Sequence, residues 1–210
     1  MAERRNADRR SADRRSPLAG FAARFETASA GGALRLAEIP FLTQLNLRVD
    51  AKSPAAERIG RALGTTLPVE PGSAVRSGDL TVLWLGPDEW LVLGPDEGEA
   101  EIGAGGAGLR DRLVEAAGSA DGHVSVVDVS AQRTTLVLAG ARARDVLAHG
   151  CALDLHPRVF GPGRCAQTLL ARAQVVLVAR ETDEFWVLCR SSFAGYVAEW
   201  LLDAAAEYVT

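Results

Sequence analysis

The chain has 210 residues, of which about half are apolar and a quarter charged, and its net charge is −4. A chain of this length can bury a large core without metal or disulfide bonds. The mildly acidic charge argues against nucleic acid binding, and no apolar run reaches the ~20 residues that span a bilayer. The N-terminus has no apolar stretch typical of a secretion signal. The three cysteines (Cys151, Cys165 and Cys189) lack disulfide-framework spacing, so we expect reduced thiols and a cytoplasmic protein.

The first sixteen residues repeat a short Arg-rich pattern. Six arginines stand against Glu3, Asp8 and Asp13, and the repeat has a period of five. Because that period matches neither helix nor strand burial, we predict a disordered tail over 1–16. Both a solvated tail and an arm that touches an acidic partner are compatible with this composition.

Residues 17–122 read as a first α+β unit. Its segments are an alternating strand Thr43–Val49, a helix near 54–63, a hairpin of strands Leu80–Leu85 and Glu89–Leu93, and a helix near 109–117. Ser53 is the expected N-cap of the first helix, Pro54 its first residue, and Gly64 its end. Gly86-Pro87-Asp88 is a turn sequence that favours the hairpin.

Residues 123–210 repeat that order as a second unit. Its segments are a strand Thr134–Leu138, a helix Ala141–Ala148, strands Cys165–Ala171, Val175–Ala179 and Phe185–Cys189, and a closing helix Phe193–Tyr208 capped by Ser191 or Ser192. The sequence therefore predicts an α+β fold of two pseudo-symmetric strand-helix-strand-strand-helix units, with mainly antiparallel sheets, packed as one body.

The closing helix is amphipathic. Its predicted apolar face consists of Phe193, Tyr196, Val197, Trp200, Leu201 and Ala204. The opposite side carries Glu199, Asp203 and Glu207 at intervals of four residues, where like charges weaken an isolated helix. A basic partner surface would offset that effect, so the acidic stripe is a candidate interface; an ordinary solvated face is the alternative.

One segment satisfies a dinucleotide-binding pattern. Gly103–Gly108 matches G-x-G-x-x-G before a helix, and Asp128 follows twenty residues later. The nucleotide fold needs a buried strand that runs into the first glycine, but residues 97–102 are mostly acidic. We expect a connecting loop and no cofactor on this chain.

Three further groups of residues invite a functional interpretation. His149, Cys151, His156, Cys165 and Cys189 lack the paired spacing of a zinc site, so we expect no metal. Asp128, Ser130, Gln132 and Arg133 cluster at a strand junction and suit either a polar binding site or internal turn bonding. Trp84, Trp90, Trp186 and Trp200 are core residues or, where exposed, interface anchors, and Trp90 is the candidate among them.

Four segments carry a resemblance to a known family. They are Ile39–Arg48, Leu85–Leu91, Val127–Thr134 and Arg190–Ala194, and they resemble the gamma subunit of heterotetrameric sarcosine oxidase in order from about Ser16 to Tyr208. That resemblance implies a fold similar to the folate-binding domains of the glycine-cleavage T-protein. It assigns no catalytic residue to this chain.

The resemblance also implies partners and chemistry. The family's complex of alpha, beta, gamma and delta subunits demethylates sarcosine oxidatively to glycine, forming hydrogen peroxide and 5,10-methylenetetrahydrofolate. FAD, FMN, NAD, tetrahydrofolate and zinc are expected on the other subunits. The alternative is a free-standing tetrahydrofolate-binding or aminomethyl-transfer protein. Candidate interface residues are Trp90, Asp128, Gln132, Arg133, Glu199, Asp203 and Glu207.

Overall fold

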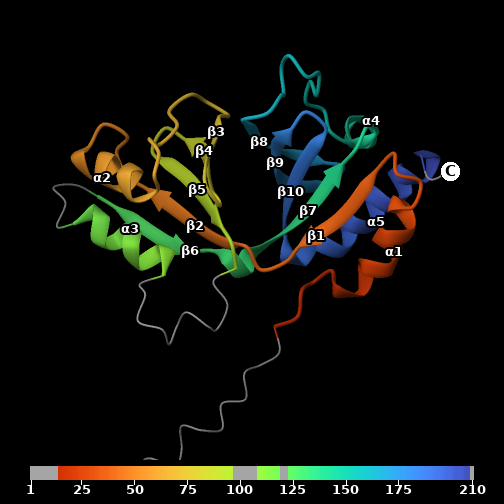
Figure 1. Ribbon diagram of the computed structural model, residues 1–210, viewed down its shortest axis with the longest axis horizontal. Helices are drawn as coiled ribbons and strands as arrows, with labels where there is room; N and C mark the ends of the chain where they lie inside the picture. The colour runs from red at the N-terminus through yellow and green to blue at the C-terminus, as the bar shows by residue number, and fades with distance from the viewer. Residues whose placement is uncertain (1–13, 97–107, 119–122, 209–210) are drawn as a thin grey trace, which may run out of the picture.

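The computed structural model describes residues 14–96, 108–118 and 123–208. Residues 1–13 of the tail predicted over 1–16, and most of the Gly-rich loop, lie outside these ranges. Two five-stranded antiparallel sheets pack against each other, and helices cover the outer face of each sheet (Figure 1). This four-layer arrangement confirms the predicted α+β class with antiparallel sheets.

Each sheet has the same internal order of strands. The first sheet runs β3 (Ala74–Ser77), β4 (Leu80–Gly86), β5 (Glu89–Gly94), β2 (Thr43–Arg48) and β6 (Ser125–Asp128). The second sheet runs β8 (Arg164–Leu170), β9 (Ala173–Glu181), β10 (Glu184–Arg190), β7 (Arg133–Ala139) and β1 (Arg35–Ile39). The predicted internal repeat is therefore visible in the strand order.

The two halves of the chain exchange one edge strand. β1 precedes β2 in the chain but pairs with β7, with Leu36 opposite Leu138, and β6 precedes β7 but pairs with β2, with Leu47 opposite Val126. Neither 17–122 nor 123–210 thus holds all the strands of one sheet. The predicted boundary at residue 122 separates the two repeats of the sequence. It does not separate the strands of one sheet from the strands of the other.

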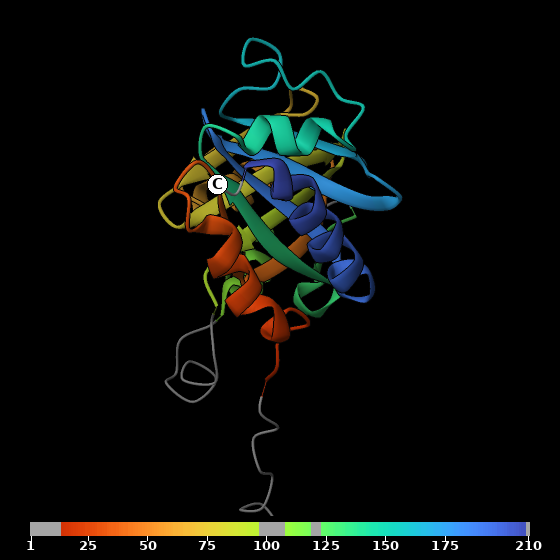
Figure 2. The ribbon, with the colours of Figure 1, turned by 90° about the vertical axis from the view of Figure 1, so that its right-hand side faces the viewer.

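Helices close the outer face of each sheet. The first sheet is covered by α2 (Pro54–Ala62) and α3 (Leu109–Ala117), and the second by α1 (Ala22–Ser29), α4 (Ala143–Ala148) and α5 (Ala194–Ala205) (Figures 1 and 2). Arg58 on α2 ties the first pair together, because its guanidinium donates to the carbonyl oxygens of Ala116 (2.9 Å) and Ala117 at the end of α3. Such bonds satisfy carbonyls that a helix end leaves unpaired.

The inner layer between the sheets is apolar. Leu83, Leu91 and Leu93 of the first sheet pack on Val176, Val178, Leu188 and Cys165 of the second. At one edge the sheets also bond directly, since the Ala74 N–H donates to the Gly163 carbonyl (2.8 Å) and the Cys165 N–H to that of Gly72 (2.8 Å). Burial and backbone bonding therefore hold the two repeats as one body.

Local sequence signals explain the best-predicted helix. The Ser53 hydroxyl accepts a hydrogen bond from the Ala56 N–H (3.2 Å), Pro54 is the first helical residue, and Gly64 has a φ of +72°. A residue with a side chain is strained at that φ, so glycine suits the position after the helix. All three predictions for α2 are confirmed.

The closing helix differs from its prediction. The α-helix spans Ala194–Ala205, and short 3-10 turns flank it at Ser191–Phe193 and Ala206–Tyr208. The predicted serine cap is wrong: Phe193 occupies the N-cap, and the Ser191 hydroxyl instead donates to the Ala131 carbonyl (3.0 Å). Within the described parts of the chain, no helix is long and apolar enough to cross a membrane.

Candidate functional site

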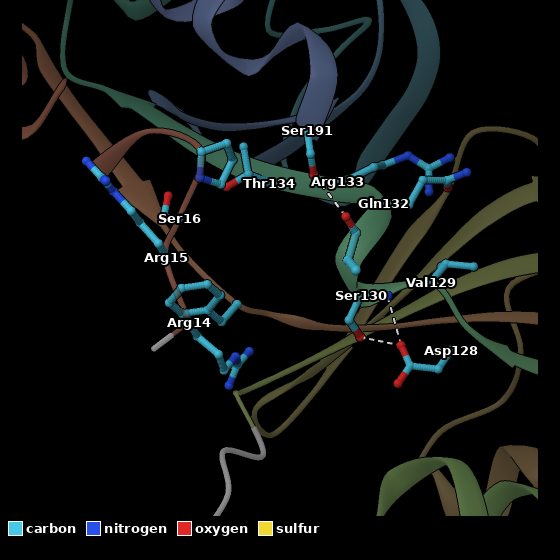
Figure 3. A pocket seen from close by; sticks show the side chains of 13 residues that line it. Arg14, Arg15, Ser16, Asp128, Val129, Ser130, Gln132, Arg133, Thr134 and Ser191 are labelled. Atoms are coloured by element: carbon cyan, nitrogen blue, oxygen red, sulfur yellow. Dashed lines mark hydrogen bonds between the residues drawn. The ribbon is translucent and has the colours of Figure 1, made fainter. Parts of the chain in front are cut away.

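The predicted polar cluster at Asp128–Arg133 lines a surface pocket of about 800 Å³. The pocket lies where β6 leads through the 3-10 turn Ser130–Gln132 into β7, beside the link from β1 to β2 (Figure 3). Its lining residues are Arg14, Arg15, Ser16, Pro17, Phe41, Asp128, Val129, Ser130, Ala131, Gln132, Arg133, Thr134 and Ser191. The structure therefore brings three of the candidate residues, Asp128, Gln132 and Arg133, to one site.

Asp128 bonds within its own turn. Its Oδ1 accepts from the Ser130 N–H (2.8 Å) and from the Ser130 hydroxyl (2.6 Å), which stabilises the 3-10 turn between β6 and β7. Asp and Ser side chains favour such local bonding to the backbone. The turn-bonding interpretation of Asp128 thus accounts for the carboxylate in this structure.

Gln44 holds this turn in place through two hydrogen bonds, and it was not predicted from the sequence as a site residue. Its backbone N–H donates to the Ser130 hydroxyl oxygen (2.9 Å), and its side-chain amide donates to the Arg133 carbonyl (3.1 Å). Gln44 is only 1% exposed. A glutamine on the buried side of an apolar strand is the signal that could have identified this position, because a buried amide needs partners.

Glu38 holds together Ser16 and Thr134, two residues that line another side of the pocket. Its carboxylate accepts from the Ser16 hydroxyl and from the Thr134 hydroxyl (2.5 Å). Arg14 lies over the Phe41 ring (4.3 Å to its centroid) and pairs with Asp96 (2.8 Å). These contacts place residues 14–16 against the body, at the end of the range 1–16 that the sequence assigns to a tail.

Arg133 lies at the rim of the pocket. Figure 3 shows its side chain directed away from Arg14 and Arg15. Burial, and next the nearby positive charge of Arg190, lower the pKa of the Arg133 guanidinium. Arg133 and Arg190 therefore place two positive charges next to each other beyond the rim of the pocket.

The hydroxyl groups inside the pocket bond to other residues of the chain. Each of its serine and threonine hydroxyls already donates to a partner: Ser16 and Thr134 to Glu38, Ser130 to Asp128, and Ser191 to Ala131. No histidine or cysteine lines the pocket within the described residues. The titratable groups that line the pocket are Asp128 and the arginines, and Asp128 already accepts hydrogen bonds from Ser130.

Trp90 is not an interface residue. It is 0% exposed, it packs in the core between the first sheet and its helices, and its indole N–H donates to the Pro68 carbonyl (2.7 Å). A fully buried side chain offers no surface to a partner. Its placement in the candidate interface was therefore wrong, and the core interpretation is correct.

The acidic stripe on α5 is only partly available. Arg24 of α1 bonds both oxygens of Glu199, at 2.5 and 2.6 Å, while Asp203 and Glu207 are exposed. The predicted apolar face also changes, since Val197, Leu201 and Ala204 are buried but Phe193 and Tyr196 are 44% and 40% exposed. A cation of this chain thus pairs with the first acid, and the role of the other two stays a prediction.

The remaining sequence motifs give no site among the described residues. Gly108 alone of the glycine pattern lies in them, and it precedes α3. Across 14–96, 108–118 and 123–208, no three His, Cys, Asp or Glu side chains gather in a way that could hold a metal ion. The three cysteines are buried as free thiols.

Comparison with known proteins gives consistent matches. The model of the sarcosine oxidase gamma subunit family matches residues 48–207. The chain is 38% identical over 196 residues to the sarcosine oxidase subunit gamma of an Arthrobacter species, covering 93% of this chain and 91% of that one. It is 40% identical over 198 residues to the corresponding subunit of Corynebacterium sp. strain U-96, with 92% and 90% covered.

Solved structures agree with these matches. A chain of the heterotetrameric sarcosine oxidase from Corynebacterium sp. U-96 superposes with a TM-score of 0.83 at 36% identity, covering 94% of this chain and 97% of that one. The glycine cleavage aminomethyltransferase T from Bartonella henselae gives a TM-score of 0.56 at 16% identity, covering 85% and 48%. The second match shows a shared fold and confirms the predicted T-protein-like architecture.

Proposed function

Because the chain belongs to the sarcosine oxidase gamma subunit family, we propose that it is a structural subunit of a heterotetrameric sarcosine oxidase and contributes no catalytic residue. The observation that carries this proposal is the likeness to a chain of a solved heterotetrameric sarcosine oxidase over nearly the whole length of both chains. The self-contained bonding of the pocket supports it, since the hydroxyl groups there bond to residues of the chain itself.

The partners in this proposal are alpha, beta and delta subunits in the cytoplasm. The complex oxidises sarcosine with oxygen: two electrons and two protons pass to O₂ to give hydrogen peroxide, the methyl carbon passes to tetrahydrofolate as a methylene group, and glycine is released. FAD, FMN, NAD, tetrahydrofolate and zinc are held by the other subunits. The residues of this chain shape and stabilise the assembly.

Co-expression with the three partner subunits tests this function. Size-exclusion chromatography with subunit quantification should give one peak that contains all four chains in equal amounts. A stable monomer that elutes apart from the other three at micromolar concentration would refute the proposal.

No observation favours the alternative of a free-standing folate-binding or aminomethyl-transfer protein. The likeness to the T-protein is one of fold, at 16% identity, and fold alone does not specify a ligand. Titration calorimetry of the isolated chain with tetrahydrofolate decides between the two: we expect no binding heat up to millimolar ligand, and saturable binding would revive the alternative.

A further inference from the structure

A row of four side chains crosses the second sheet near the end of the inner layer. Arg133 on β7 stands directly opposite Arg190 on β10, and Gln174 on β9 stands opposite Leu169 on β8. Cys189 pairs with Val175, so the same register brings Arg190 beside Gln174. Because paired residues of antiparallel strands point to the same face, all four side chains project toward the side of the first sheet.

This row marks where the apolar inner layer ends. The next row inward, Thr135, Leu188 and Val176, is 1%, 0% and 3% exposed. It ends at Gln167, whose amide donates to the Leu85 carbonyl of the first sheet (3.1 Å). Beyond it, Arg133, Arg190, Gln174 and Leu169 line an open groove of about 370 Å³, here called the arginine groove.

The two arginines of the arginine groove have no ion-pair partner within the described chain. Neither Arg133 nor Arg190 forms an ion pair with any carboxylate of residues 14–96, 108–118 or 123–208. Glu89 acts on Arg133 from a distance, but its carboxylate already accepts from Asn46 (2.7 Å) and Arg48 (3.3 Å). Like charges directly opposite on neighbouring strands destabilise a sheet, so the isolated chain carries a repulsion that an added carboxylate would remove.

Exposed apolar side chains lie at the same end of the second sheet as this charge, Leu169 on the same face and two aromatic residues on the face that the helices cover. Leu169 in the row itself is 52% exposed, and Phe193 and Tyr196, at the start of the closing helix, are 44% and 40% exposed. The Tyr196 hydroxyl accepts from the Arg172 N–H (3.4 Å) in the turn between β8 and β9, so the aromatic residues lie at the same end of the sheet as Leu169. Arginine and aromatic side chains beside an apolar surface are enriched at protein interfaces and dominate their binding energy.

We propose that the arginine groove receives an acidic segment of a partner subunit, which places a carboxylate between Arg133 and Arg190 and an apolar side chain against Leu169. This inference rests on the proposed function. Guanidinium groups bind carboxylates through paired, charge-assisted hydrogen bonds, and the partly buried setting of Arg133 strengthens them. The two arginines thus select an acidic residue, and Leu169 selects its apolar neighbour.

The test compares two matched charge removals in the full chain. One variant carries Arg133→Gln with Arg190→Gln, and the control carries Arg110→Gln with Arg112→Gln, two exposed positions of α3. The dissociation constant for the co-expressed remaining subunits is measured at low and high salt. We expect the double variant to bind at least about tenfold more weakly and to lose part of the salt dependence, while the control binds as wild type.

The outcomes separate this inference from the proposed function. Four-chain assembly with unchanged affinity in the double variant would overturn the groove inference and leave the proposed function intact. Failure of the wild-type chain to assemble would overturn the function itself. Binding of free glutamate or citrate at the two arginines, with assembly unaffected, would identify a small-molecule anion site and contradict the docking proposal.

Chemical protection of the wild-type chain provides a second test that needs no variant. A dicarbonyl reagent should modify Arg190, which is exposed in the isolated chain, and mass spectrometry should show that assembly slows this modification at least about tenfold. Arg110 should react equally in both states. Equal reactivity of Arg190 in the free chain and in the complex would contradict the proposal, even if the double variant fails to fold.

Discussion

Arg24 on α1 holds both carboxylate oxygens of Glu199 on α5, at 2.5 and 2.6 Å. This pair fastens the N-terminal helix to the closing helix across 175 residues of chain. It also explains how an acidic stripe can lie on α5 without a partner protein at its first position. The neighbouring cation lowers the pKa of Glu199, chiefly through the hydrogen bond.

The Arg24–Glu199 pair predicts a specific dependence of stability on pH. Because the pKa of Glu199 is lower in the folded state, its contribution is complete above the unfolded value near 4.3 and disappears as pH falls through the folded value. Wild type should therefore unfold at a slightly higher temperature than Glu199→Gln at pH 7, and the difference should vanish in acid. A difference that grows below pH 4 would contradict this assignment.

Trp90→Phe should destabilise the chain without an interface effect of its own. The substitution removes the donor to the buried Pro68 carbonyl and leaves a cavity, so the free energy of unfolding should fall by about 2–4 kcal/mol. Urea denaturation measures this, and Trp84→Phe, at a partly exposed position, is the milder control. Unchanged stability together with weaker subunit binding would return Trp90 to the interface.

Gly150→Ala should destabilise the contact between α4 and α5. A Cβ at this position would stand 2.7 Å from Cη2 of the Trp200 ring and 3.1 Å from the Ala171 nitrogen. Overpacking of this kind costs about 1–3 kcal/mol, and a smaller residue at position 200 should recover part of the loss. Gly195→Ala is the matched control, because a Cβ there meets no atom within 4 Å and the helix gains propensity. Equal stability of Gly150→Ala and wild type would show that the Trp200 ring can move aside without cost.

The cysteine thiols should be unreactive in the folded chain. Burial raises the pKa of Cys165 to about 11 and that of Cys189 to about 12, whereas an unfolded thiol titrates near 8.5. An aromatic disulfide reagent at pH 8 should thus label both residues only after denaturation. Their contribution to stability is complete below about pH 8.5 and declines above it. Rapid labelling of either thiol in the native protein would contradict the burial that this structure gives them.

Local signals in the sequence predicted local structure well. Ser53, Pro54 and Gly64 determine the bounds of α2, and the turn at Pro87 and Asp88 determines the β4–β5 hairpin, because each acts through backbone groups a few residues away. Other elements carry weaker local signals, because α1 lacks a capping side chain and β1 and β6 are short strands. The strand exchange between the halves depends on pairings about a hundred residues apart, which periodicity cannot reveal.

The candidate site was predicted in part for the same reason. Asp128, Gln132 and Arg133 are close in sequence, and their common pocket follows from one strand junction. Arg133 and Arg190 belong to strands whose partnership only the sheet register establishes, so the arginine groove had no sequence signal. Trp90 was misplaced because an alternating strand does not show which of its faces a second layer covers.

Sarcosine-dependent formation of hydrogen peroxide, measured in three preparations, shows whether this chain acts as a structural subunit. The preparations are this chain alone, the three partner subunits without it, and the four chains together. We expect no turnover by this chain alone, and a more stable activity from the fully assembled complex when all four chains are present. Turnover by the isolated chain, or full and equally stable activity without it, would contradict its role as a structural subunit.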